Sequence, residues 1–176
     1  MKRLFIAFIT LLMITPIYAR EFSYSLSSEE DISGATVERR TMYIIDEMQK
    51  DPGNESSNLV FYEYKEGDDI STFFYIRYYD KEWRFYNGLL INIDGKVFTL
   101  NKTFDDNNVR SGGYVSEYCY IELSNDVLTA LKKAKDIKVQ LIASKYKHSV
   151  VTLPKEAINA INLFASRDFD KLKKDK

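Results

Sequence analysis

A succession of short strand-like segments separated by turn residues constrains the fold of this chain more than any other feature. The expected strands cover residues 58–65, 70–79, 83–93, 96–100 and 114–123, and aromatic and β-branched residues fill them. Between two of these segments, Asp94-Gly95 gives the sharpest turn signal, because both residues tolerate the positive φ angles of a two-residue hairpin. The pattern predicts a largely meandering antiparallel sheet.

Helical patterns follow in the last third of the chain. Ser124 is expected to cap a first helix, and Pro154 stands where the first turn of a second helix begins. Between them, residues 137–143 alternate as a strand, with 149–153 as the expected partner. We therefore expect an α+β domain, with an antiparallel sheet of about six to eight strands and two helices late in the chain.

The first nineteen residues have the order of a secretory signal peptide. Lys2 and Arg3 are basic, residues 4–14 are almost wholly apolar, and the segment ends on the small residue Ala19. The apolar run is too short to span a bilayer comfortably, and Arg20 offers no thiol for lipidation. We therefore expect a periplasmic or secreted protein without a stable membrane anchor after cleavage.

The remaining chain suits one domain. The expected division is a signal peptide (1–19), a loose N-terminal lead-in (20–35), a single α+β domain (36–170) and a charged tail (171–176). The sequence contains one cysteine, so no internal disulfide can form. Secreted domains of animals often carry such bridges, so a bridge-free exported chain favours a bacterial envelope protein.

Charge and motif content favour neither nucleic-acid binding nor nucleophilic catalysis. The 25 basic and 26 acidic residues give a net charge of −1, which does not favour nucleic acid as a partner. The single histidine, His148, has no catalytic motif around it and is expected at the surface. Cys119 is in phase with apolar neighbours on its strand, so we expect a buried, unreactive thiol. Glu117 shares that strand face, and we expect a structural acid with a partner.

Metal chemistry has little support in the sequence. One histidine and one cysteine cannot make a closed zinc site. The run Asp105-Asp106-Asn107-Asn108 has oxygen ligands, but it lacks the alternate spacing and distal glutamate of a calcium loop, and we expect it in a polar loop over 101–113. We expect no cofactor and no metal.

The tyrosine and arginine residues of the expected strands do suggest a binding surface. When the expected strands are read with period two, each has an aliphatic side and a side rich in tyrosine and arginine. Tyr and Arg combine flat apolar area with hydrogen-bonding groups, as protein and sugar ligands both require. The alternative interpretation is that these tyrosines only stabilise the sheet by cross-strand pairing or fill a second layer. The candidate binding residues are Tyr75, Arg77, Tyr79, Arg84, Tyr86, Tyr118 and Tyr120.

Three functional hypotheses remain at this stage. The first is a small non-enzymatic binding or interaction protein of the bacterial envelope, with an unknown protein or an envelope glycan as its partner. The alternatives are a carboxylate-based hydrolase of an envelope polymer and a structural envelope component. The absence of a catalytic signature favours the first.

Overall fold

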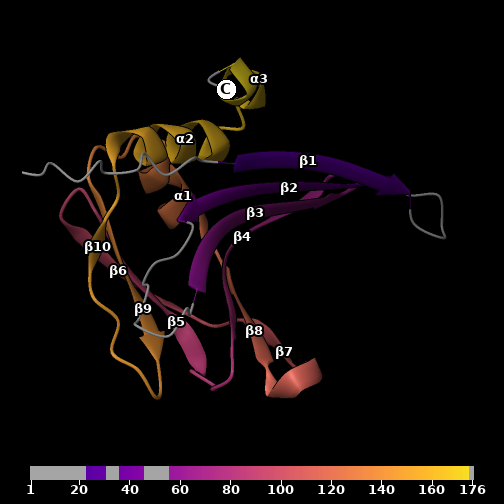
Figure 1. Ribbon diagram of the computed structural model, residues 1–176. Coiled ribbons are helices and arrows are strands. Elements are labelled where there is room, and N and C mark those ends of the chain that lie inside the picture. Colours follow the sequence, from indigo (N-terminus) through magenta and orange to yellow (C-terminus); the bar gives the residue numbers. More distant parts are fainter. Residues whose placement is uncertain (1–22, 31–35, 46–55, 175–176) are drawn as a thin grey trace, which may run out of the picture.

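The computed structural model describes residues 23–30, 36–45 and 56–174, and their strands form two antiparallel sheets with helices late in the chain (Figure 1). The larger sheet has the order β1-β2-β3-β4-β8-β7 and the smaller one β10-β9-β5-β6. This arrangement confirms the α+β class. The predicted signal peptide lies outside the described residues, so it stays a prediction.

The larger sheet contains β1 (Ser23–Glu30), β2 (Thr36–Ile45), β3 (Ser56–Glu66), β4 (Asp69–Asp80), β7 (Phe104–Val109) and β8 (Val115–Glu122). The smaller sheet contains β5 (Tyr86–Ile93), β6 (Lys96–Asn101), β9 (Ile137–Ala143) and the two-residue β10 (Val151–Thr152). The helices are α1 (Asn125–Leu131), α2 (Lys155–Ala165) and α3 (Phe169–Lys174), with a 3-10 turn over Ser111–Gly113.

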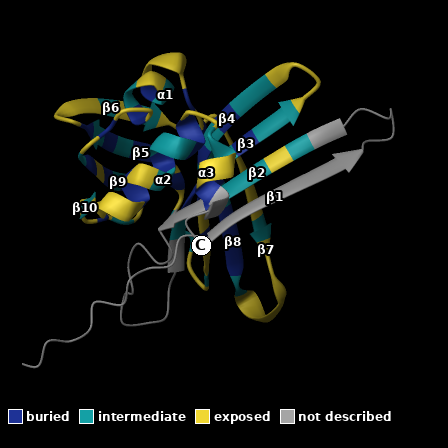
Figure 2. Ribbon diagram, turned by 90° about the horizontal axis from the view of Figure 1, so that it is seen from above, coloured by how far each residue is buried: buried dark blue, intermediate teal, exposed yellow. Residues whose placement is uncertain are grey.

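Strand β4 shows the alternation that the sequence predicts. Phe74, Ile76 and Tyr78 are buried, whereas the residues between and after them are half-buried or exposed. Successive side chains of a strand point to opposite faces, so one face of the larger sheet enters the core and the other remains accessible. Helices and the smaller sheet cover the core face, and Figure 2 shows the buried residues concentrated there.

The hairpin between β5 and β6 confirms the predicted turn. Asp94 and Gly95 both have positive φ angles, 50° and 89°, as a two-residue hairpin of the favoured hand requires. Farther back in β5, the pairing register shifts between Tyr86 and Gly88. A Cβ atom on Gly88 would lie 2.1 Å from the carbonyl oxygen of Leu100, so only glycine fits this close approach.

Both predicted helices form and close the core. The Ser124 hydroxyl accepts from the backbone N–H of Val127 at 3.5 Å, which confirms the predicted cap of α1. The apolar side of α2 is buried, and Ile161 lies on it. From the same side, the ring of Phe164 stacks on that of Phe61 in β3, with 4.5 Å between the centroids. Within the described ranges, no helix combines the length and the apolar character that crossing a membrane would need.

Three segments differ from the expectation. The lead-in 20–35 contains β1, which pairs with β2, and the expected loop 101–113 contains β7, which pairs with β8. Both are edge strands. In β1 the alternation is short, with Tyr24 and Leu26 between serines, and β7 has four polar residues in a row, so the pairing of β7 rests on main-chain hydrogen bonds. These additional strands raise the number described above the six to eight expected. The expected charged tail begins inside α3, which is held by the buried Leu172.

Candidate functional site

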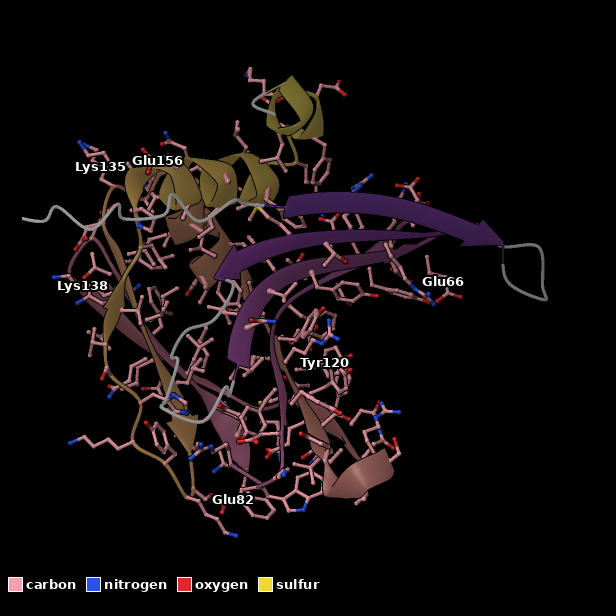
Figure 3. All side chains as sticks on the ribbon, viewed as in Figure 1. Glu66, Glu82, Tyr120, Lys135, Lys138 and Glu156 are labelled. Atoms are coloured by element: carbon pink, nitrogen blue, oxygen red, sulfur yellow. The ribbon has the colours of Figure 1, made fainter. Side chains whose placement is uncertain are left out.

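Five of the seven candidate binding residues lie together on the accessible face of the larger sheet. In the register of β4 against β8, Tyr75 stands opposite Tyr120, Arg77 opposite Tyr118, and Tyr79 opposite Ser116. Figure 3 shows Tyr120 on the side of this sheet that is turned away from the helices. The alternation of two neighbouring strands is therefore sufficient to place these five side chains on one surface.

Aromatic rings on this surface form a connected array. The ring centroids of Tyr75 and Tyr120 are 5.3 Å apart, and Phe104 stacks on Tyr120 at 4.4 Å. Phe73 contacts Phe104 edge-on at 5.9 Å, and Tyr62 lies 6.1 Å from Tyr75. We call this surface the tyrosine face; its members are Tyr62, Phe73, Tyr75, Arg77, Tyr79, Phe104, Tyr118 and Tyr120.

Solvent reaches the tyrosine face. Tyr79 and Phe104 keep 46% and 48% of their surface exposed, Arg77 is exposed, and the remaining rings are half-buried. Partial burial raises the pKa of Tyr120, with smaller contributions from Tyr62 and Asp106 nearby. The Tyr120 phenol therefore stays protonated at neutral pH and can donate a hydrogen bond to a ligand.

Charges of both signs surround the rings. Asp106 stands opposite Tyr118 on the edge strand β7, and Glu122 stands opposite Phe73. The Asp106 carboxylate accepts from the Asn108 amide at 2.7 Å. On β4, Arg77 brings a guanidinium to the same face. The surface thus combines an aromatic centre with a polar, mixed-charge border.

One end of the tyrosine face is extended by a residue that the sequence analysis did not select. Tyr114 stacks on Tyr79 with 5.0 Å between the centroids and 1° between the planes, and the ammonium of Lys81 lies 5.6 Å from the Tyr114 ring. The signal was present in the sequence, because counting back from Tyr118 in steps of two reaches Tyr114. Phe104 gave no such signal, since it was expected in a loop.

Arg84 and Tyr86 do not belong to this surface, and their assignment to it was wrong. Tyr86 is 2% exposed and packs between Tyr78 and His148, with centroids 5.7 and 5.4 Å away. Arg84 donates from Nε to the Tyr78 hydroxyl at 3.0 Å, and its guanidinium lies 4.4 Å from the Tyr146 ring.

Arg84 and Tyr86 lie off the tyrosine face because the regular alternation of side chains between the two faces of a strand is interrupted here. Phe85 has a φ of 56°, in the left-handed region, so the alternation that begins at Trp83 does not continue into β5. The register shift before Gly88 changes the phase again, as a bulge does. In addition, β5 belongs to the smaller sheet, which places it away from the tyrosine face.

His148 also differs from the expectation of a surface residue. It is 5% exposed, and its ring lies 4.7 Å from Tyr146 as well as 5.4 Å from Tyr86. Its backbone carbonyl accepts from the Gln140 side chain at 2.7 Å. The polar residues around His148 in the sequence gave no sign that two tyrosines would cover it.

Cys119 and Glu117 are placed as the sequence predicts. Cys119 is 1% exposed, and burial, the largest cause, raises the pKa of its thiol to about 12. Glu117 is 2% exposed, and its two carboxylate oxygens accept backbone N–H groups of Arg84 at 2.5 Å and Tyr86 at 3.2 Å. Glu117 is therefore a partnered structural acid that holds the start of β5.

The polar run Asp105-Asp106-Asn107-Asn108 lies within β7, so its side chains point alternately to the two faces of the sheet. Asp105 pairs with Lys102. Over the ranges that the structure describes, His, Cys, Asp and Glu side chains nowhere gather in threes suited to a metal ion.

Comparison of the chain with models of protein families, with curated proteins and with solved structures finds no match.

Proposed function

We propose that this chain is an exported, non-enzymatic binding protein of the bacterial envelope that holds a partner on the tyrosine face. The observation that carries the proposal is the gathering of tyrosine, phenylalanine and arginine side chains on one solvent-facing side of a sheet. Rings fixed on strands lose little conformational freedom when a partner docks, so most of their contact energy contributes to affinity.

A protein surface fits this face better than the other partner class, an envelope glycan. Protein interfaces are enriched in Tyr, Phe and Arg at their centre and are polar at their rim. The tyrosine face has this composition, with Asp106 and Glu122 on one side and, on the other, Lys81 over the Tyr114 ring that stacks on Tyr79. The exported location rests on the predicted signal peptide alone.

The competing interpretation is that the rings serve only to stabilise the sheet. Cross-strand aromatic pairs contribute to sheet stability whether or not a ligand binds. The two interpretations differ for Arg77, because an exposed arginine on the face contributes little to folding but much to an interface.

No observation favours the carboxylate hydrolase. The two buried glutamates of the described chain, Glu63 and Glu117, each use both oxygens in bonds to protein groups. General acid–base catalysis needs a carboxyl group that can reach a substrate proton.

The test combines site-specific photo-crosslinking with charge reversal. A photoreactive residue at Tyr79 should form a defined adduct in envelope extract, and the same residue at Val97, exposed on β6, should not. Arg77→Glu should abolish the adduct at Tyr79, whereas Lys138→Glu, an exposed change on β9, should leave it unchanged. Equal adducts at both positions, or an adduct indifferent to Arg77→Glu, would refute the proposed face. An adduct with a glycan would show that the partner is an envelope glycan and not a protein.

A further inference from the structure

A separate pocket of about 220 Å³ lies where α1 and the C-terminal end of α2 meet strands β3 and β4. Leu128 and Phe164 supply apolar wall, and most of the other lining side chains are polar. Figure 1 shows α1 directly beneath α2 on this side of the molecule. None of its lining residues belongs to the tyrosine face, so the pocket is distinct from the proposed binding surface.

A buried carboxylate, Glu63, lies in the wall of the pocket. It is 2% exposed, and its oxygens accept from Arg40 Nη1 at 2.5 Å and from Arg167 Nε at 3.0 Å. The Arg40 guanidinium also pairs with Glu38 at 2.6 Å and lies 4.1 Å from the ring of Phe169. Each oxygen of Glu63 therefore accepts from a guanidinium group, so the buried carboxylate is partnered by positive charge.

Arg167 occupies a backbone position that ordinarily favours glycine. Its φ is 60°, and it directly follows Ser166, the C-cap of α2. Its N–H donates to the Phe164 carbonyl, and that of Asp168 to the Leu163 carbonyl, each at 2.9 Å, which is the pattern of a helix end closed by a left-handed residue. An arginine at this position is unfavourable for the backbone, and its side chain makes an ion pair with Glu63 that glycine could not make.

The guanidinium of Arg167 is held by one nitrogen only. Nε bonds Glu63, while neither Nη group bonds any residue that the structure describes. Lys132, which also lines the pocket, likewise makes no ion pair within the described chain. Thr129 and Ser166 add hydroxyl groups to the same lining. The lining thus carries two cationic side chains, several neutral donors and one carboxylate, so its net charge is positive.

We propose that this pocket binds the oxyanion group, a carboxylate or a phosphate, of a small ligand between Lys132 and Arg167. Guanidinium and ammonium groups are the side chains that recognise such groups, and the fixed orientation of Arg167 lowers the entropic cost of binding. The volume is below the range of about 300–1,000 Å³ that drug-sized ligands occupy. The pocket therefore admits the anionic end of a ligand rather than a large molecule.

Titration with inorganic phosphate, followed by backbone amide NMR at constant ionic strength, tests the proposal. We expect saturable shifts at Thr129, Lys132 and Ser166. Lys132→Ala should weaken phosphate binding about fivefold, the upper end for a partly exposed charge contact. Lys133→Ala is the matched control, because Lys133 is also exposed but does not line the pocket. Lys132→Arg should retain the affinity.

Acetate in a parallel titration distinguishes the two kinds of oxyanion. Saturable binding of phosphate or acetate with the same dependence on Lys132 supports the proposal and identifies the preferred group. The proposal is overturned if neither phosphate nor acetate binds saturably. It is also overturned if Lys132→Ala and Lys133→Ala weaken binding equally, which would indicate a diffuse surface charge effect. Thermal unfolding of each variant without ligand shows whether the fold is intact.

Discussion

Glu63 and Arg167 are 104 positions apart in the chain and form an ion pair at 3.0 Å that joins strand β3 to the end of helix α2. Glu63 is buried, whereas the Arg167 side chain remains 46% exposed. The pair therefore fixes the helix end to the sheet while leaving much of the guanidinium side chain in contact with solvent. It also involves a residue in a left-handed backbone conformation.

Two substitutions separate these contributions of Arg167. Arg167→Gly and Arg167→Ala both remove the bond to Glu63, but only the alanine variant keeps a Cβ in the left-handed conformation. We expect the glycine variant to be more stable than the alanine variant by about 1 kcal/mol. Urea denaturation at neutral pH measures the difference. An alanine variant as stable as the glycine variant would show that the helix end changes conformation once the ion pair is lost.

Tyr86 and Tyr118 should respond differently to truncation. Tyr86 is enclosed between Tyr78 and His148, so Tyr86→Ala removes a core ring and should cost about 3 kcal/mol in the free energy of unfolding. Tyr118 is half-buried on the tyrosine face, and Tyr118→Ala should cost less than about 1 kcal/mol. Chemical denaturation of both variants checks the contrast. Similar losses in the two would contradict the placement of Tyr86 in the core.

The tyrosine face could be predicted from the sequence wherever side chains alternate regularly between the two faces of a strand. Buried and accessible residues alternate over residues 73–79 of β4, and β8 pairs with β4 without a register shift, so reading every second residue placed Tyr75, Arg77, Tyr118 and Tyr120 on the correct side. The register that sets Tyr75 against Tyr120 is a long-range property, which phase within a single strand does not contain.

The errors arise where the backbone departs from regular geometry or where distant segments meet. The positive φ of Phe85 ends the phase that would have placed Arg84 and Tyr86 on the face. Strand β7 is polar and gains its conformation from pairing with β8, so its own residues do not indicate it. The pocket at Glu63 depends on Arg167, and no local pattern links positions so far apart.

Asp94 makes the stability of the hairpin depend on pH. Backbone N–H groups of Lys135 and Asp136 donate to its Oδ1 at 2.9 and 2.8 Å, and these bonds lower the pKa of Asp94 below its ordinary value of 3.8. The charged form is favoured in the folded state, so its contribution is fully present above pH 3.8 and is lost as the pH falls through the lower folded pKa.

The test compares the natural chain with Asp94→Asn, which keeps the turn conformation and the oxygen acceptor but removes the charge. We expect the variant to be less stable at pH 7 and the two proteins to converge as the pH falls below 3.8. Thermal unfolding between pH 2 and pH 7 measures this convergence. A stability difference that stays constant over the range would exclude a contribution from the Asp94 charge.

Cys119 should be chemically silent in the folded protein. Its thiol is 1% exposed, and burial raises its pKa to about 12, so both access and the thiolate fraction at pH 8 are low. We expect a thiol reagent such as Ellman's to react at least about 100-fold more slowly with the native protein than with the chain in guanidinium, since labelling requires opening of the sheet. The sequence holds a single cysteine, so the absorbance change reports this thiol alone, and Cys119→Ala provides the blank. Rapid stoichiometric labelling under native conditions would mean that β8 does not hold Cys119 in the core.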